Sequence, residues 1–268
     1  PGPANEPGEQ DIFVYLRPET NGVLAESTIL KVVKAANGDQ PAMKLIFLAN
    51  FPGEFIVDHK IVEQYYSLKF HFAVVGKTAF TEDMKQRFTE WFKVPFEKAD
   101  IIGSFRALEI LKKDPEELFG TWVAEEDVSL INGQCIKRIG DIFVVNYDIP
   151  ALIHKNSKNT DIAVMVFRCQ QPYENIKSLV AAMHKALCTA DILSPQFDPS
   201  RAFHWSKGPF EQLLDGIAYL YPVSGFKLRL EDFTYGRWVL AQGIDPKELG
   251  RVLMKPIVQV RRPDGRIT

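Results

Sequence analysis

The chain has 268 residues, 46% of them apolar and 25% charged, which is the composition of an ordinary water-soluble globular protein with room for one large domain or two smaller ones. Lys and Arg (32) nearly balance Asp and Glu (34), so the chain lacks the global basic field that usually accompanies nucleic-acid binding, although that class stays open. No stretch approaches the roughly 18 consecutive apolar residues of a membrane span, and residues 1–10 lack the charged-then-apolar pattern of a signal peptide. We therefore expect no membrane association, and a flexible tail over residues 1–10.

The first elements alternate between strand and helix. Apolar runs predict three strands, over 11–16, 42–51 and 69–75. Residues 23–36 predict a helix, and the Asn37-Gly38 pair that follows is a common helix-ending signal.

The next elements are helices with marked first turns. Thr81 begins one of them, and its apolar residues fall on a single face: Met84, Phe88, Trp91 and Phe92. Residues 99–104 include a short strand. We expect Ser104 to cap the helix after it, and residues 114–117, Asp-Pro-Glu-Glu, to open one more helical turn.

The pattern changes at residue 128. Strand-like runs over 128–145 are separated by two-residue turns at Asn132-Gly133 and Gly140-Asp141, and Asn-Gly favours the positive φ angles of a tight hairpin turn. These runs predict an antiparallel meander, which residues 161–168 join after a twelve-residue connection. Connections of that length are more often functional than short ones.

The remaining chain is mostly helical. Amphipathic helices are predicted over 172–187 and from 209, followed by helix, turn and helix, and then by a strand and an Asp-Gly turn within 257–268. The predicted fold class is α/β (α+β): a mixed sheet with an antiparallel meander in its second half, helices packed on it, and a small helical C-terminal extension. We expect a main domain over 11–205 and a helix-rich module over 206–268.

Gly76-Lys77-Thr78 resembles the end of a phosphate-binding loop. That loop requires a first glycine five positions before Gly76, where the chain has His71, and a run of free backbone amides. Because the intervening residues 72–75 are predicted to lie in a strand, their amides are committed to a sheet. The motif therefore predicts no phosphate-binding loop.

Polar residues crowd the connection over 146–161. Asp148 could orient His154, whose ordinary pKa suits proton transfer at neutral pH, and lysines beside it could hold an anion. The same composition is common in solvated loops, which is the competing interpretation. The candidate catalytic residues are Asp148 and His154, and the candidate ligand-binding residues are Asn146, Lys155, Asn156 and Lys158.

Two short stretches resemble nucleoside diphosphate kinases. Arg17-Pro18-Glu19 with Gly22 is similar to the Lys-Pro-Asp-Gly opening of that family, and residues 63–69 are similar to another piece of it. The catalytic motif of the family is Asn-x-x-His-Gly-Ser-Asp, of which residues 151–157 keep only the histidine, His154. We do not assign the chain to this family.

Residues 238–253 resemble a helix-turn-helix. Gly243 would make the turn, and the apolar residues that would pack the two helices are Ile244, Leu249 and Val252. A basic hairpin over 257–268 could then contact phosphates. The candidate nucleic-acid contacts are Lys247, Arg251, Arg261 and Arg262. Two short helices joined by a glycine also occur in proteins that bind no DNA.

No metal site or cofactor is expected. The five histidines show no i, i+4 pair, and Cys135, Cys169 and Cys188 have no zinc-ligand spacing, so we expect free thiols in the cytoplasm. No standard catalytic signature is present in the sequence. The sequence therefore favours a non-catalytic regulatory or interaction protein that binds a protein partner or a small anionic ligand. The alternatives are an enzyme of acid/base or phosphoryl-transfer type using 146–161, and a DNA-binding protein using 238–253.

Overall fold

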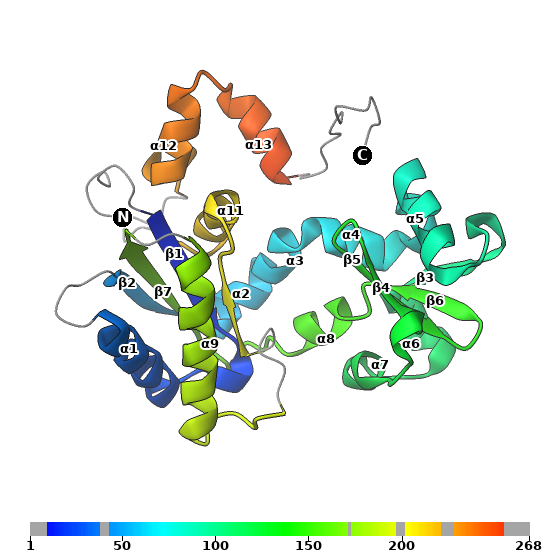
Figure 1. Cartoon of the computed structure of the whole chain (residues 1–268), viewed down its shortest axis with the longest axis horizontal. Coiled ribbons are helices and arrows are strands. Elements are labelled where there is room, and N and C mark those ends of the chain that lie inside the picture. Colours follow the sequence, from blue (N-terminus) through cyan, green and yellow to red (C-terminus); the bar gives the residue numbers. More distant parts are fainter. Residues whose placement is uncertain (1–9, 38–42, 171–172, 197–201, 221–227, 255–268) are drawn as a thin grey trace. The chain divides into compact units, whose positions relative to one another are not determined.

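The computed structural model describes residues 10–37, 43–170, 173–196, 202–220 and 228–254. The chain divides into two compact units (Figure 1): unit 1 consists of 1–61 and 156–249, and unit 2 consists of 62–155 and 250–268. The predicted fold class is confirmed, since the protein is α/β with two sheets and helices packed around them. The boundary expected near residue 206 falls inside unit 1, and an independent module over 206–268 stays a prediction.

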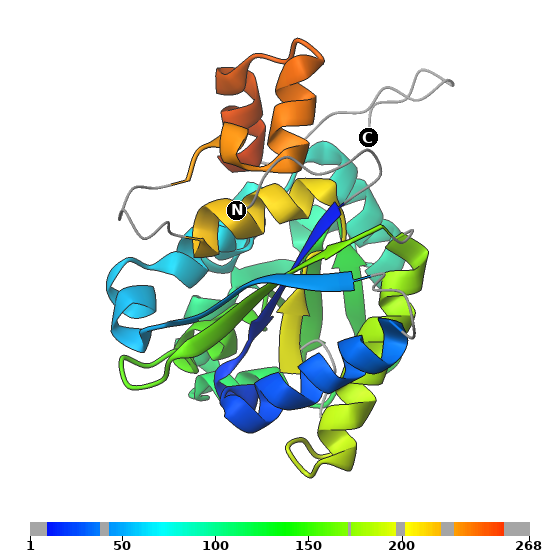
Figure 2. The same ribbon diagram turned by 90° about the vertical axis from the view of Figure 1, so that its left-hand side faces the viewer.

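The sheet of unit 1 is antiparallel throughout, with strand order β2-β7-β1-β8. Its strands are β1 (Gln10–Leu16), β2 (Met43–Phe51), β7 (Ile162–Cys169) and β8 (Phe203–Trp205). Helices α1 (Val23–Asn37) and α9 (Tyr173–Thr189) lie side by side on one face of this sheet (Figure 2). The order of elements is that of a split βαβ, or ferredoxin-like, sheet, with most of unit 2 inserted in sequence between β2 and β7.

Alternation along β1 separates the two faces of this sheet. Ile12 and Val14 are buried in the cluster that includes α1 and α9, because every second side chain points to the same face. Tyr15 points to the opposite face and stacks on His204 of β8 at 4.4 Å between ring centroids. His204 in turn lies 3.0 Å from Asp215 of α11 (Pro209–Tyr219), so α11 covers this second face.

The other described elements of unit 1 are short. They are η1 (Pro18–Thr20), α2 (Gly53–Asp58), η5 (Leu230–Asp232) and α12 (Thr234–Ala241), while α3 (Ile61–Tyr65) and α13 (Pro246–Met254) each cross a unit boundary. The predicted sequence of helix, turn and helix near the C-terminus is confirmed by α12 and α13. The strand and turn predicted within 257–268 lie outside the described residues.

The sheet of unit 2 is mixed, with strand order β3-β6-β5-β4. Its strands are β3 (Asp100–Gly103), β4 (Val128–Ile131), β5 (Gln134–Ile139) and β6 (Ile142–Val145), and only the β3–β6 pair is parallel. The predicted meander is therefore confirmed over 128–145. The helices of this unit are α4 (Ser67–Val75), η2 (Gly76–Ala79), α5 (Glu82–Phe92), η3 (Phe96–Lys98), α6 (Ser104–Leu111), α7 (Pro115–Gly120), η4 (Glu125–Asp127) and α8 (Ile149–His154).

Aromatic side chains fill one face of the unit 2 sheet. Phe88 of α5 packs edge-on against Phe143 of β6, with 4.8 Å between the ring centroids, which is a favourable geometry for two aromatic rings. Phe88 belongs to the apolar stripe predicted on α5, whereas Trp91, predicted on the same stripe, is 52% exposed. Thr81 caps the helix by accepting from the amide of Met84. On the other face, Val144 packs with Ala107 of α6 and Leu118 of α7.

Several sequence predictions about the fold are wrong. Residues 69–75 form helix α4, because a short apolar run fits either a buried strand or a helix. Residues 161–168 join the sheet of unit 1 as β7 and not the meander. Ser104 does not cap α6: Gly103 occupies the N-cap position, and the Ser104 hydroxyl is buried without a hydrogen-bond partner among the described residues.

No helix within the described ranges is long and apolar enough to cross a membrane.

Close packing between α4 and the end of β3 generates a test of this fold. A Cβ atom added at Gly103 would overlap the backbone carbonyl of Ala73, which cannot move away as a side chain could. Gly103→Ala should lower the free energy of unfolding by about 1–3 kcal/mol, as overpacking usually does. Gly120→Ala is the matched control, because a Cβ there meets no atom within 4 Å. Equal urea midpoints for the two variants would contradict the packing described.

Candidate functional site

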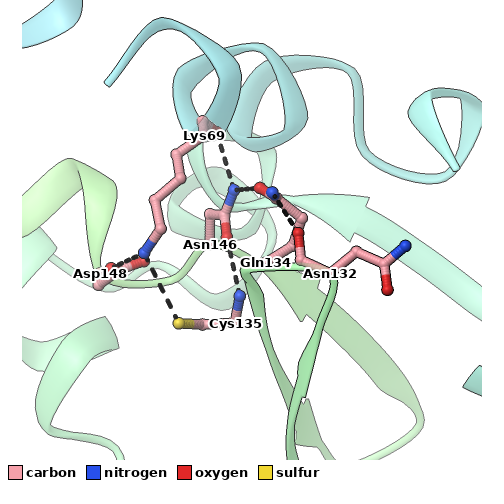
Figure 3. Close-up of polar contacts among 6 residues, drawn as sticks. All are labelled: Lys69, Asn132, Gln134, Cys135, Asn146 and Asp148. Carbon is pink, nitrogen blue, oxygen red and sulfur yellow. Dashed lines mark hydrogen bonds and ion pairs between the residues drawn. The ribbon is translucent and has the colours of Figure 1, made fainter. Parts of the chain in front are cut away.

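The side chain of Asn146 is the centre of a buried polar network in unit 2 (Figure 3). Its amide nitrogen donates to the carbonyl of Lys69 at 2.9 Å and to the side-chain oxygen of Gln134 at 2.8 Å. Its amide oxygen accepts from the backbone N–H of Cys135 at 3.0 Å. Asn146 thereby joins α4, β5 and the turn after β6, and its own φ of 52° is one that Asn tolerates better than most residues.

An ion pair and a thiol adjoin this network. Lys69 Nζ lies 3.0 Å from Asp148 Oδ2 and 3.8 Å from Cys135 Sγ (Figure 3). Burial acts to lower the pKa of Lys69, but the charge of Asp148, the charge of Cys135 and the hydrogen bond to Asp148 outweigh it, so this pKa lies above its ordinary value of 10.5. Burial raises the pKa of the Cys135 thiol above its ordinary 9.0, and the charge of Asp148 adds to the rise, while the charge and the hydrogen bond of Lys69 oppose it.

These two pKa shifts oppose catalysis at neutral pH. A nucleophilic cysteine needs a lowered pKa and a nucleophilic lysine needs to lose its proton, whereas here the thiol and the ammonium are both kept protonated. Because both pKa values are raised in the folded protein, they contribute to the free energy of unfolding at neutral pH. This contribution is lost only as the pH rises through the raised pKa values. The cluster is therefore suited to holding α4, β5 and the start of α8 together.

The structure separates the predicted catalytic pair. Asp148 bonds Lys69, and no hydrogen bond joins it to His154 in the described part of the chain; His154 is exposed at the end of α8. The segment predicted as a connection thus contains a helix. Sequence reasoning found Asp148 and Asn146 but missed Lys69, because α4 is distant in sequence and was predicted as a strand.

The predicted anion-holding residues belong to different units. Lys155 lies in unit 2, 3.7 Å from Glu116, whereas Asn156 begins the second part of unit 1. Lys158 lies 2.5 Å from Asp58, whose hydrogen bond and charge raise the pKa of this exposed lysine. Each lysine therefore has a carboxylate beside it, which leaves less positive charge to hold an anionic ligand.

The helix-turn-helix candidates are only partly described. Gly243 has the positive φ of a turn, 82°, but Ile244 is 44% exposed, although the motif needs it between the helices. Lys247 and Arg251 are exposed on α13, and Arg261 and Arg262 lie outside the described residues. The packing at Ile244 departs from that of the motif.

Gly76 and Lys77 have structural roles. Residues 71–75 are helical, so their amides are committed to α4 and not, as predicted, to a strand. Gly76 ends this helix at a φ of 62°. Lys77 Nζ donates to the carbonyls of Glu97 and Ala99, at 3.0 and 2.8 Å.

A second candidate site is a surface at the free edge of the unit 2 sheet. We call it the β4 edge surface and define it by Trp91, Trp122, Glu125, Glu126 and Leu130. Trp122 is 86% exposed, Leu130 69% and Trp91 52%. Because Ile131 packs against α5, its neighbour Leu130 points to the opposite face of the sheet, so Trp91 and Leu130 lie on different sides of this edge.

Contacts within unit 2 hold Trp91 and the backbone that precedes Trp122. Trp91 of α5 donates its indole N–H to the carbonyl of Glu126 at 3.2 Å, and η4 leads directly into β4. Lys137 of β5, whose pKa is lowered by burial, donates to the carbonyl of Thr121 at 2.8 Å and so anchors the backbone next to Trp122. Trp122 is four residues from Glu126, so their Cα atoms are at most about 14 Å apart.

The surface is acidic as well as aromatic. Residues 114–127 contain six acidic residues and no basic one, in a chain whose net charge is only −2. Glu125 and Glu126 are exposed, and their carboxylates make no ion pair among the described residues. Asp127, by contrast, lies 4.0 Å from Arg138. The run of acidic residues around Trp122 was visible in the sequence, but the exposure of Trp122 was not.

No group of three or more His, Cys, Asp or Glu side chains is arranged to hold a metal ion in the parts of the chain that the structure describes. Comparison with protein-family models, with curated proteins and with solved structures yields no match to this chain.

Replacing Asn146 tests the buried network. Asn146→Ala removes three hydrogen bonds, leaves buried partners unsatisfied and puts a β-carbon at positive φ, so the free energy of unfolding should fall by about 2–4 kcal/mol. Asn146→Gly loses the same hydrogen bonds without the backbone strain, so its free energy of unfolding should fall by about 1 kcal/mol less than that of Asn146→Ala. Urea denaturation followed by tryptophan fluorescence measures both. Wild-type stability in Asn146→Ala would refute the role of the network.

Alkylation of Cys135 tests the protonation state of the cluster. Because its pKa is raised, Cys135 should react slowly with iodoacetamide at about pH 7.5. Asp148→Asn removes a charge that raises this pKa, so alkylation should become severalfold faster. Mass spectrometry of the peptide containing Cys135 gives the rate, and the peptide containing Cys188 is the internal control. Rapid alkylation of Cys135 in the wild type would contradict the inferred protonation state.

Proposed function

We propose that this protein is a non-catalytic interaction protein of the cytoplasm, which binds a basic segment of a partner protein at the β4 edge surface. The observation that carries the proposal is the exposed indole of Trp122 within a stretch of six acidic residues and no basic one. Tryptophan is among the residues that contribute most to binding free energy when a partner covers them.

The chemistry of the surface favours a cationic partner. Arg and Lys side chains bind over the faces of indole rings, and Trp91 and Trp122 offer two such rings. Glu125 and Glu126 attract the same groups over a longer range, which increases the rate of encounter. A basic segment with intervening apolar residues would use the carboxylates and also cover the apolar side chains.

The other interpretations have less support. Lys155 and Lys158, the lysines that would hold a small anion, each have a carboxylate within 4.0 Å. The acid/base interpretation depends on Asp148 and His154, and Asp148 is engaged by Lys69 instead. Three cysteines outside any disulfide, Cys135, Cys169 and Cys188, are the support for a reducing compartment such as the cytoplasm.

Truncation of Trp122 tests the proposal. The probe is a ten-residue peptide of alternating arginine and valine, titrated into the full chain by calorimetry. Trp122→Ala should weaken binding by about tenfold, or about 1.4 kcal/mol, because it removes the most exposed indole of the surface. The fold should tolerate this change, since the side chain is mostly outside the core.

Trp238→Ala is the matched control, because Trp238 is also exposed (56%) but lies on α12 of unit 1. Binding to this variant should equal that of the wild type, and added salt should weaken both. A peptide that fails to bind at low salt, or equal losses in the two tryptophan variants, would refute the proposed site.

A further inference from the structure

The register of the β4–β5 hairpin determines which backbone groups of β4 point outward. Asn132 and Gly133 have φ angles of 47° and 79°, as in a type I′ turn, and Ile131 pairs with Gln134 across it. Pairs that exchange hydrogen bonds alternate with pairs that do not, so the next pair, Leu130 and Cys135, exchanges none. The N–H and C=O of Leu130 therefore point away from β5.

The bonding of Cys135 supports this register independently. Its N–H donates to the side chain of Asn146, and its C=O accepts from the backbone N–H of Asn146 at 2.6 Å. Both groups of Cys135 are thus directed to the β6 side of β5. In an antiparallel pair that exchanges no hydrogen bonds, the backbone N–H and C=O groups of the two opposed residues point away from each other. The N–H and C=O of Leu130 therefore face the outer edge of β4.

That outer edge is open. β4 is the last strand in the order β3-β6-β5-β4, and within the described residues no group outside the hairpin bonds the backbone of Leu130. The opposite edge, β3, is packed closely against α4, since Gly103 lies directly against Ala73. β4 therefore presents unpaired backbone groups to a further strand.

The edge strand β2 of unit 1 is protected in ways that β4 is not. Its register shifts between Leu45 and Phe47, and it carries Lys44; an irregularity and a lysine both discourage pairing with another strand. β4 is Val-Ser-Leu-Ile, with no charge, proline or bulge, and it exposes the side chain of Leu130. An unprotected edge that also exposes a large apolar side chain is suited to strand addition.

We propose that the partner segment binds in extended conformation as a fifth strand beside β4, bonding the N–H and C=O of Leu130; this rests on the proposed function. Because β4 has only four residues, the added strand makes few backbone hydrogen bonds, and its side chains supply the remaining free energy. Alternate side chains of a strand share a face. The partner is therefore a segment in which basic residues, directed to Glu125 and Glu126, alternate with apolar residues that cover Leu130.

Leu130→Pro tests strand addition, because it removes the outward N–H while every inward hydrogen bond of β4 stays. Proline is tolerated at edge positions of this kind, so the variant should fold, as its circular dichroism spectrum and melting temperature will show. Its affinity for the arginine–valine peptide should be about tenfold lower than that of Leu130→Ala, which loses the side chain but keeps the N–H. Leu130→Ala is thus the matched control.

A second arm uses the wild-type protein and does not depend on how Leu130→Pro folds. One methylated peptide carries methyl groups on the backbone nitrogens that would face β4, and it should bind about tenfold more weakly, as expected for Leu130→Pro. A second peptide, methylated on the nitrogens of the opposite edge, should bind as the unmodified peptide does. If Leu130→Pro and both methylated peptides bind as tightly as their parents while Trp122→Ala still loses binding, strand addition is refuted and the proposed function stands. If the unmodified peptide does not bind at all, both are refuted.

Discussion

The side chain of Asn146 is the interaction on which the rest of unit 2 depends. It joins the carbonyl of Lys69 in α4 to the side chain of Gln134 and the amide of Cys135 in β5, and it is completely buried. Asn146 also bonds the N–H and the C=O of Cys135, which point away from β4, so that β6 and the turn after it lie on that side of β5. β4 must then take the other side and end the sheet. The buried network and the exposed edge are in this way two consequences of a single register.

The same network accounts for the chemical character of the unit. Lys69, Cys135 and Asp148 are the residue types that many active sites use, yet both resolved pKa shifts keep the protonated forms at neutral pH. A cluster arranged in this way stabilises the fold. At the β4 edge surface, by contrast, unit 2 exposes indole rings, carboxylates and strand backbone to other molecules. The proposed function therefore rests on surface chemistry.

Local signals in the sequence were reliable where local physics decides. Asn132-Gly133 predicted the hairpin turn because these residues adopt positive φ easily, and residues 114–117 predicted the start of α7, where the structure shows a capping box of Asp114 and Glu117. The prediction of a strand over 69–75 failed because seven mostly apolar residues fit the repeat of a helix and that of a strand equally well. Of the candidate site residues, Asp148 and Asn146 belong to one cluster, whereas no signal along the chain could identify Lys69 as their partner.

The sequence by itself determined the composition, the charge balance, most helices and strands, the cap at Thr81 and the hairpin turn, because each depends on residues a few positions apart. Only the tertiary structure decided that β7 joins the sheet of unit 1, that α4 is a helix, and that Asp148 bonds a lysine 79 residues away. It also decided that Trp122 is exposed. These outcomes depend on which surfaces are buried together, and burial is settled by the free energy of the whole fold and not by any short stretch of it.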